Sequence, residues 1–238
     1  MNATATLRTR NMNKRRERLL AEARFLLANG GFEALNLREL ARLADVTVPT
    51  IYNLIGRKED VLLALGADVL NEIESRTTPG EDADPLTIAA AVVVESIGLF
   101  AENEDFYRAA FLAVEWLDQG GQHHAEVARI YAWVGRLVTS GIEACRAAHL
   151  LRGRIPATSM SGLVTRNFRM SCRGWAFGHY GLDEFRRIAL SDLYITLSAD
   201  GVETFQVQLL RRIASLAPSV AEGGASDDTR RNHRGDTP

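Results

Sequence analysis

The chain has 238 residues, of which 46% are hydrophobic and 24% charged, and its formal net charge is −2. This composition is typical of a soluble globular protein that buries a real core. Its two cysteines lack a CxxC spacing, which argues against a disulfide framework and favours a reducing compartment. The first residues lack the apolar segment of a secretory signal, and the most apolar run, 86–101, is interrupted by Glu95 and too short to span a bilayer. We therefore expect a soluble, cytoplasmic protein.

Charge is distributed unevenly along the chain. Residues 1–60 contain 11 Lys and Arg against 7 Asp and Glu, whereas the remainder contains 17 against 23. A basic N-terminal part on an acidic body suggests an anionic partner for the first part only.

The hydrophobic periodicity predicts an all-α fold, with almost nothing typical of a strand. Residues 77–85 are expected to form a linker, and the polar segment 218–238 a disordered tail. The expected helices lie at 13–29, directly after Asn36, directly after Thr47, and at 58–75, 86–102, 104–118, 122–151, 158–180, 184–198 and 201–216.

The third of these helices is short and has two distinct sides. Thr47 caps it, and on a helical wheel Ile51, Leu54 and Ile55 form an apolar back. Pro49, Tyr52 and Asn53 point the other way, with Thr50 on the flank. Asn pairs bidentately with adenine, while Thr and Tyr reach phosphates or thymine methyl groups. The pattern therefore predicts a helix that enters a DNA major groove.

The preceding residues complete a helix-turn-helix spacing. Asn36 caps the second helix, and Glu39 three residues later gives a capping-box pattern. Ala41 is small where two helices cross closely, and Asp45 stands where a positive φ is needed, which Asp tolerates better than most residues.

The stretch "GFEALNLRELARLADVTVPTIYNLIGRKEDVLLAL" (31–65) resembles the N-terminal region of the tetracycline-repressor (TetR) family of transcriptional regulators. The matching elements are "GF", the capped second helix, "V-T-x-x-T-I-Y" and "K-E-D-V-L". Leu54 and Ile55 replace an aromatic pair common in the family, and Pro49 replaces a small residue. The close match covers about 13–65, and beyond it only the architecture is similar.

The resemblance implies an N-terminal three-helix DNA-binding domain (13–60) followed by a larger helical ligand-binding and dimerisation domain (61–217). Lys58 would hold a backbone phosphate. Residues 1–12 would form a flexible basic arm, or alternatively a frayed terminus. The predicted DNA contacts are Asn36, Arg38, Thr47, Pro49, Thr50, Tyr52, Asn53 and Lys58.

No catalytic or metal-binding constellation is visible in the body, so we expect neither an enzyme nor a cofactor. Glu95 is the candidate polar contact for a largely hydrophobic ligand, and the alternative is that it faces solvent or pairs with a neighbouring Arg. Arg166, Arg169 and Arg173 are expected to form a solvated face. The predicted ligand contacts, most of which could instead be ordinary core, are Glu95, Phe100, Phe111, Tyr131, Trp133 and Trp175.

Two long helices near the C-terminus carry apolar stripes that predict a dimer interface, as in the resembled family, where such helices form a four-helix bundle. The alternative is that the stripes close the core of the monomer. The predicted interface residues are Met160, Val164, Phe168, Trp175, Ile188 and Leu193.

The function predicted from these features is a ligand-responsive regulator, in the form of a repressor. It would bind a palindromic operator as a homodimer and be released by a small, largely hydrophobic molecule. The alternative is a helical small-molecule-binding or enzymatic protein whose N-terminal bundle does not bind DNA.

Overall fold

The computed structural model of the chain describes residues 3–77 and 83–217, with side chains from residue 10 onwards. Within these ranges it contains α-helices and one isolated antiparallel bridge, between Leu151 and Gly201, so the predicted all-α fold is confirmed. The predicted tail and residues 78–82 of the predicted linker lie outside the described residues. The helices are α1 (Ala3–Ala34), α2 (Leu37–Ala44), α3 (Val48–Leu54), α4 (Lys58–Thr77), α5 (Pro85–Glu102), α6 (Glu104–Gln119), α7 (His124–Ala147), α8 (Ala157–Ala176), α9 (Leu182–Ser198) and α10 (Glu203–Leu216).

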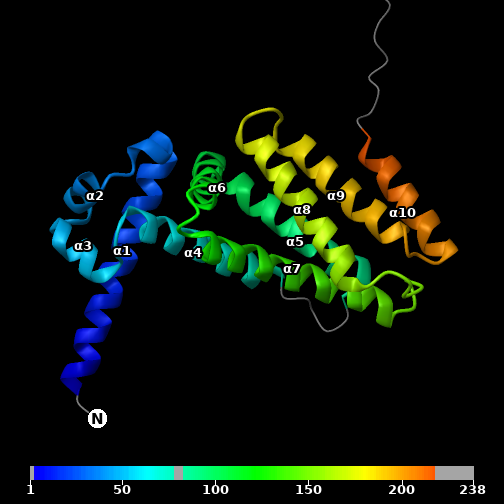
Figure 1. Cartoon of the computed structure of the whole chain (residues 1–238), viewed down its shortest axis with the longest axis horizontal. Coiled ribbons are helices and arrows are strands. Elements are labelled where there is room, and N and C mark those ends of the chain that lie inside the picture. Colours follow the sequence, from blue (N-terminus) through cyan, green and yellow to red (C-terminus); the bar gives the residue numbers. More distant parts are fainter. Residues whose placement is uncertain (1–2, 78–82, 218–238) are drawn as a thin grey trace, which may run out of the picture.

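The helices form two groups joined by α4 (Figure 1). α1, α2 and α3 make a small lobe at one end, beyond which the N-terminal part of α1 projects. Helices α5 to α10 make a larger body at the other end. Because α1 also packs against α6 of the body, the predicted boundary near residue 60 stays a prediction.

The first helix begins at Ala3, ten residues earlier than predicted, so the segment expected as a flexible arm is helical from that residue. The reason lies in the local sequence, which has no Gly or Pro before Gly30 and is rich in good helix formers. The helix breaks at Gly31, whose φ of 64° and ψ of −164° lie outside the helical region. The regular helix therefore ends close to the predicted residue 29, and a short second helical segment follows the break as far as Ala34.

The helix-turn-helix caps form as the sequence predicts, with one exception. The Asn36 side chain accepts a hydrogen bond from the Glu39 amide at 2.8 Å, and Thr47 accepts one from the Thr50 amide at 3.4 Å. Asp45 adopts the left-handed conformation, with φ 54° and ψ 51°. The reciprocal half of the capping box is missing, because the Glu39 carboxylate binds Arg42 at 2.6 and 2.9 Å instead.

A buried apolar cluster fixes the lobe. Leu19 of α1, Leu40 of α2 and Ile51 of α3 are completely buried, and Leu35 fills the space after α1. Each buried leucine or isoleucine contributes roughly 1.5–3 kcal/mol relative to an exposed one. This cluster positions the short α3 against its two longer neighbours.

Two helices of the body are shorter than predicted. α7 ends at Ala147 rather than near 151, and His149 then takes a positive φ of 57°. α8 ends at Ala176 rather than near 180, close to Gly178 with a φ of 78°. The chain turns left-handed at these points, so the helices cannot continue.

The loop after α7 is held to the turn after α9 by a buried carboxylate. Asp200 is 1% exposed, and its side chain accepts hydrogen bonds from the amides of Gly153 at 2.8 Å and Arg154 at 3.0 Å. Backbone N–H donors compensate the cost of burying the charge. The contact joins segments that are almost 50 residues apart in sequence.

α5 is the central helix of the body, with nine of its residues buried. Gly141 of α7 lies so close to it that an added Cβ would stand 2.5 Å from the Cα of Ala89. The helix is the one among the described residues with the length and hydropathy to cross a membrane, and half of it is buried inside the protein. That burial is what a core helix requires.

Candidate DNA-binding surface and ligand cavity

α3 presents polar side chains on its outer side. Its apolar anchor, Ile51, is completely buried, whereas Tyr52 is 52% exposed and Asn53 is also exposed. Thr47 and Pro49, at the start of the helix, are exposed too. The short helix therefore lies on the lobe by its apolar back, with an amide and a phenol directed to solvent, and these groups can bond to base edges or phosphates.

The predicted DNA contacts differ in whether their polar groups are free. The hydroxyls of Thr47 and Thr50 bond to each other at 2.9 Å, and the Asn36 carbonyl oxygen is occupied by its capping bond. Within the described part of the chain, no hydrogen bond or ion pair engages the side chains of Tyr52 and Asn53. The same holds for Arg38, which is exposed on α2. The side chains of Arg38, Tyr52 and Asn53 therefore have all their hydrogen-bonding groups available for a partner.

Lys58, at the start of α4, is half-buried and already engaged. Its ammonium donates to the Phe32 carbonyl at 3.1 Å and lies 4.0 Å from the centroid of the Phe32 ring. A carbonyl and an aromatic face therefore hold the charge against the end of α1. One N–H donates to the carbonyl, so two remain for a phosphate.

A cavity of about 100 Å³ lies in the body, between α4, α5, α6, α7 and α8. Its walls are almost entirely apolar side chains, with few polar ones. The lining includes Gly66, Val69, Leu70, Ile73, Ser96, Phe100, Tyr107, Phe111, Tyr131, Thr165, Phe168, Arg169 and Cys172.

The structure brings half of the predicted ligand contacts to this cavity. Phe100, Phe111 and Tyr131 line it. Phe168, predicted for a dimer interface, lines it as well. Whether these residues contact a ligand stays a prediction.

Glu95, Trp133 and Trp175 do not line this cavity. Glu95 lies in a separate surface groove beside Arg186 and Tyr194, because its position on α5 faces α9 and α10. Trp133 is half-buried and packs against the core. Glu95 is therefore not part of the apolar cavity, and its contact with a ligand stays a prediction without support from this cavity.

Trp175 is a core residue. Its side chain is completely buried and stacks on Phe100, with ring centroids 5.0 Å apart and an interplanar angle of 6°. The indole N–H donates to Glu104 at 3.0 Å. Stacking and hydrogen bonding together fix the ring behind the cavity wall, where Phe100 separates it from the interior space.

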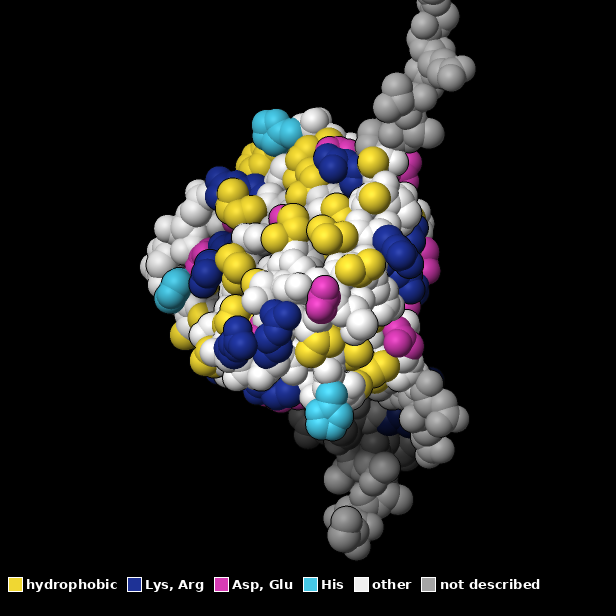
Figure 2. Space-filling view, turned by 90° about the vertical axis from the view of Figure 1, so that its right-hand side faces the viewer, with side chains coloured by type: hydrophobic (Ala, Val, Ile, Leu, Met, Phe, Trp, Pro, Cys, Tyr) yellow, Lys and Arg dark blue, Asp and Glu magenta, His cyan; other side chains and the backbone are white. Residues whose placement is uncertain are grey.

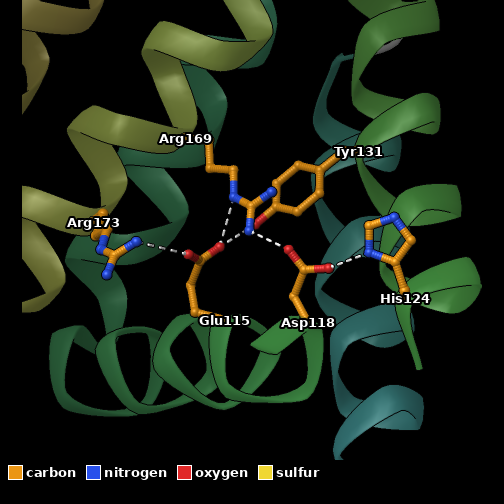
Figure 3. A network of polar contacts seen from close by, with 6 residues as sticks. All are labelled: Glu115, Asp118, His124, Tyr131, Arg169 and Arg173. Atoms are coloured by element: carbon orange, nitrogen blue, oxygen red, sulfur yellow. Dashed lines mark hydrogen bonds and ion pairs between the residues drawn. The ribbon is translucent and has the colours of Figure 1, made fainter. Parts of the chain in front are cut away.

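Tyr131 and Arg169 of the cavity lining belong to a network of polar and charged side chains (Figure 3). Arg169 of α8 donates to Glu115 and to Asp118 of α6, both at 2.7 Å. Tyr131 of α7 donates to Glu115 at 2.8 Å, and His124 bonds Asp118 at 2.8 Å. The guanidinium of Arg169 also lies 4.3 Å from the centroid of the Tyr131 ring.

The prediction that Arg166, Arg169 and Arg173 form a solvated face is therefore wrong for Arg169. Arg169 has a side chain only 31% exposed, and its partner Glu115 is 6% exposed. Arg173 adds a longer contact to Glu115 at 3.8 Å. These arginines neutralise carboxylates that the packing of α6 against α8 would otherwise leave buried and unpaired.

The network shifts the ionisation of its members. Burial alone would lower the pKa of Arg169, but hydrogen bonds to Glu115 and Asp118 outweigh it and hold that pKa above its ordinary value. The bond from Arg169 lowers the pKa of Asp118, and His124 adds to the effect. Burial, followed by the charge and hydrogen bond of Glu115, raises the pKa of Tyr131. The site therefore contains matched charges and a neutral phenol.

A second polar link connects the cavity with the lobe. Tyr107 lines the cavity and donates to Glu72 of α4 at 2.9 Å. The same carboxylate accepts a hydrogen bond from Arg24 of α1. The guanidinium of Arg24 also lies over the ring of Phe106. One carboxylate of α4 thus joins the wall of the cavity to the first helix.

Most of the predicted dimer residues are buried in the monomer. Met160, Val164, Trp175 and Leu193 are at most 3% exposed, so their side chains have no surface left for a second subunit. Ile188 is half-buried. For the four buried residues the structure therefore supports the alternative, that the apolar stripes close the core of the monomer, whereas a dimer through these two helices stays a prediction.

A different set of apolar side chains is exposed on the same two helices and on α10. Leu163, Met170 and Phe177 follow one another at seven-residue intervals on or just after α8. The exposed fractions are 40% for Leu163, 62% for Met170, 56% for Phe177, 56% for Ile195, 44% for Val207 and 60% for Leu210.

Within the described ranges, the two cysteines and the carboxylates do not form a metal site. Among the described residues, no group of three or more His, Cys, Asp or Glu side chains could hold a metal ion. Cys145 and Cys172 are free, buried thiols. Burial raises the pKa of Cys145 to about 12 and that of Cys172 well above its ordinary value, so both are protonated at neutral pH.

Residues 19–65 match the sequence model of the family described as "Bacterial regulatory proteins, tetR family". Among curated proteins, none matches the chain at a significant level.

Several solved structures share the fold at low sequence identity. Thermus thermophilus FadR, a TetR-family transcriptional repressor in complex with lauroyl-CoA, is 20% identical with a TM-score of 0.62, covering 79% of this chain and 96% of that chain. SmeT, the repressor of the Stenotrophomonas maltophilia multidrug efflux pump SmeDEF, is 17% identical with a TM-score of 0.60, covering 80% and 92%. A TetR-family regulator from Agrobacterium tumefaciens is 16% identical with a TM-score of 0.61, covering 80% and 100%.

Proposed function

We propose that the chain is a TetR-family transcriptional regulator, and that it is a repressor that a small, largely hydrophobic molecule releases from DNA. The match of residues 19–65 to the family model and the shared fold support the family. The observation that carries the proposal is the two-sided α3. Ile51 anchors it in the core while Tyr52 and Asn53 stand free in solvent. Because only the first turns of a recognition helix meet the bases, its short length is sufficient.

The DNA-bound form that we propose is a homodimer on a palindrome. Two copies of α3 would enter successive major grooves, about 34–36 Å apart or somewhat more. The surface available for pairing is the exposed stripe Leu163, Met170 and Phe177 with the neighbouring Ile195, in place of the buried residues predicted from sequence. Apolar side chains at seven-residue spacing on a helix favour packing against a second helix.

α10 adds further exposed apolar surface. The face of the molecule at the α10 end shows hydrophobic side chains interspersed with basic and acidic ones (Figure 2). Val207 and Leu210 of α10 contribute to the exposed apolar surface of the body. Burying such side chains between subunits would add hydrophobic stabilisation at about 25 cal/mol per Å² of apolar area.

α4 connects the cavity with the recognition helix and so couples ligand binding to DNA binding. Gly66, Val69, Leu70 and Ile73 of α4 line the cavity, and α4 begins only four residues after α3 ends. A ligand that binds one position of α4 more tightly than another shifts the equilibrium between these two positions of the helix. That shift would change the spacing of the two recognition helices and weaken DNA binding.

The structural neighbours support the ligand part of the proposal in general terms. FadR holds lauroyl-CoA, so binding of a small molecule with an apolar part is compatible with this architecture. A DNA-binding regulator of this kind needs no catalytic activity and acts in the cytoplasm, where its operator lies.

An electrophoretic mobility shift on the intergenic DNA upstream of the protein's own gene tests the function. We expect binding that weakens steeply with salt and resists competition by scrambled DNA, because phosphate contacts supply affinity and base contacts supply specificity. Asn71→Ala, an exposed amide on α4, should bind as the wild type does. If no salt-sensitive shift occurs, the N-terminal bundle does not bind this DNA and the chain is better described as a helical ligand-binding protein.

A further inference from the structure

The polar groups that line the cavity fall into two sets. The hydroxyls of Tyr107 and Tyr131 and the guanidinium of Arg169 all have partners within 2.9 Å. The hydroxyl oxygens of Ser96 on α5 and Thr165 on α8 are buried without a hydrogen-bond partner among the described residues. A helical Ser or Thr can satisfy itself on the carbonyl four residues earlier, and neither does so here. Buried polar atoms without partners are rare and call for an explanation.

The cavity offers no free charge to a ligand. Its one charged lining residue is Arg169, which is bound to both Glu115 and Asp118. An anionic ligand that paired with Arg169 would compete with Glu115 and Asp118, and losing Arg169 would leave Glu115, whose side chain is 6% exposed, without its closest cation. A cationic ligand would be buried without a carboxylate in the lining. Neutral molecules avoid both penalties.

The volume of the cavity limits the size of the ligand. The cavity measures about 100 Å³, which is the order of size of the apolar cavities of about 150 Å³ that bind benzene. A molecule of one ring therefore fits, and a long acyl chain with a charged head does not fit without expansion of the cavity.

We propose that the effector is a small, uncharged, mainly apolar molecule with one hydroxyl or carbonyl group, which Ser96 and Thr165 hydrogen-bond inside the cavity. This inference rests on the proposed function but concerns ligand binding alone. Ser96 is 1% exposed, so its hydroxyl meets such a ligand without competition from bulk water. The hydroxyls of Ser96 and Thr165 select for the polar group of the ligand, and the apolar walls of the cavity select for its ring.

The test compares toluene, phenol and benzoate as probes on the full chain at neutral pH, without DNA. Toluene and phenol differ by a methyl for a hydroxyl, and benzoate adds a negative charge. Dissociation constants from ligand-observed NMR should show phenol binding at least tenfold more tightly than benzoate. In the double variant Ser96→Ala, Thr165→Val, the preference for phenol over toluene should fall by about fivefold, the value of one net hydrogen bond.

Ser161→Ala is the matched control. Ser161 lies one turn before Thr165 on α8, but its hydroxyl is already bonded to the Gly135 carbonyl at 3.1 Å and to Thr139 at 2.8 Å. The control should leave the ratio of the phenol and toluene constants unchanged. If the double variant does not fold, each single variant should lower the ratio by a part of the full effect.

Three results would overturn the inference. The first is an unchanged ratio of the phenol and toluene constants in the double and single variants, which would mean that the two hydroxyls bond to water and not to the ligand. The second is benzoate binding as tightly as phenol. The third is the absence of binding by all three probes up to the solubility limit of toluene. Because no DNA is present, failure of the proposed function in the mobility shift would leave the result of this test unaffected.

Discussion

The Tyr107 hydroxyl donates a hydrogen bond of 2.9 Å to Glu72, and that carboxylate also accepts one from Arg24. A residue of the cavity wall is thus tied through α4 to the first helix of the lobe. Burial, together with the hydrogen bond and charge of Glu72, raises the pKa of Tyr107, so it remains a neutral donor.

Replacing this donor should loosen the contact between α1 and α4. Tyr107→Phe removes one hydroxyl bond and should lower the free energy of unfolding by about 1 kcal/mol in urea titrations. Amide hydrogen exchange should accelerate in α4 around residue 72 and in α1 around residue 24. Tyr180→Phe is the control, because Tyr180 donates to the Ser171 carbonyl at 2.8 Å within the body. Equal exchange in α1 and α4 for both variants would show that Glu72 does not link the two parts.

Asn53 should read a base. Asn53→Ala removes the exposed amide of α3 and should relax base preference at one position of each half-site, at a cost of roughly 1–3 kcal/mol. Binding measured on a panel of single-base operator variants reports the change, with Asn71→Ala as the control for an exposed amide outside α3. A uniform loss across the panel would assign Asn53 to the phosphates instead.

Lys58 should contribute charge rather than sequence preference. Lys58→Met keeps the apolar stem beside Phe32 but removes the ammonium, which still has two N–H groups for a phosphate. The slope of log K against log salt should fall by about one for each subunit, equally on all sequences. Lys58→Arg should retain the slope. If Lys58→Met lowers thermal stability while the slope stays that of the wild type, the residue only caps α1.

The ion pair of Asp118 with Arg169 should make stability depend on acid pH. The pKa of Asp118 is lowered in the folded state from its ordinary 3.8, chiefly by the bond from Arg169. Its stabilising contribution is therefore complete above that ordinary value and is lost as the pH falls through the lower folded value. Asp118→Asn should reduce the free energy of unfolding at neutral pH, and the difference from the wild type should shrink in strong acid. A difference independent of pH would contradict the charge pairing.

Local features of the lobe could be predicted from sequence because neighbouring residues determine them. The caps at Asn36 and Thr47 and the left-handed Asp45 depend on a few adjacent positions. The anchoring of Ile51 follows from the helical period alone. α1 begins earlier than the sequence predicts, because a basic segment rich in Ala and Arg favours helix as well as carrying charge.

The cavity could be predicted only in part, because its contacts join distant segments. Arg169 reaches carboxylates more than 50 residues away, and the periodicity of α8 cannot show which neighbour faces it. The acidic pair Glu115 and Asp118, spaced three residues apart on α6, is the signal that could have identified a partner for that arginine. The position of Glu95 outside the cavity could not be predicted for the same reason. Which side of α5 faces α9 depends on packing against other helices, and the sequence of α5 alone does not determine it.

Selection of binding sites from a random pool of double-stranded DNA tests the central claim, that two copies of α3 read a symmetric operator. We expect enrichment of a palindrome with two half-sites centred about one helical turn apart or slightly more, bound by two chains for each duplex. Asn53→Ala should lose part of the preference at one position in each half-site. Recovery of no enriched sequence, or of a single asymmetric site bound by one chain, would contradict symmetric reading by two copies of α3.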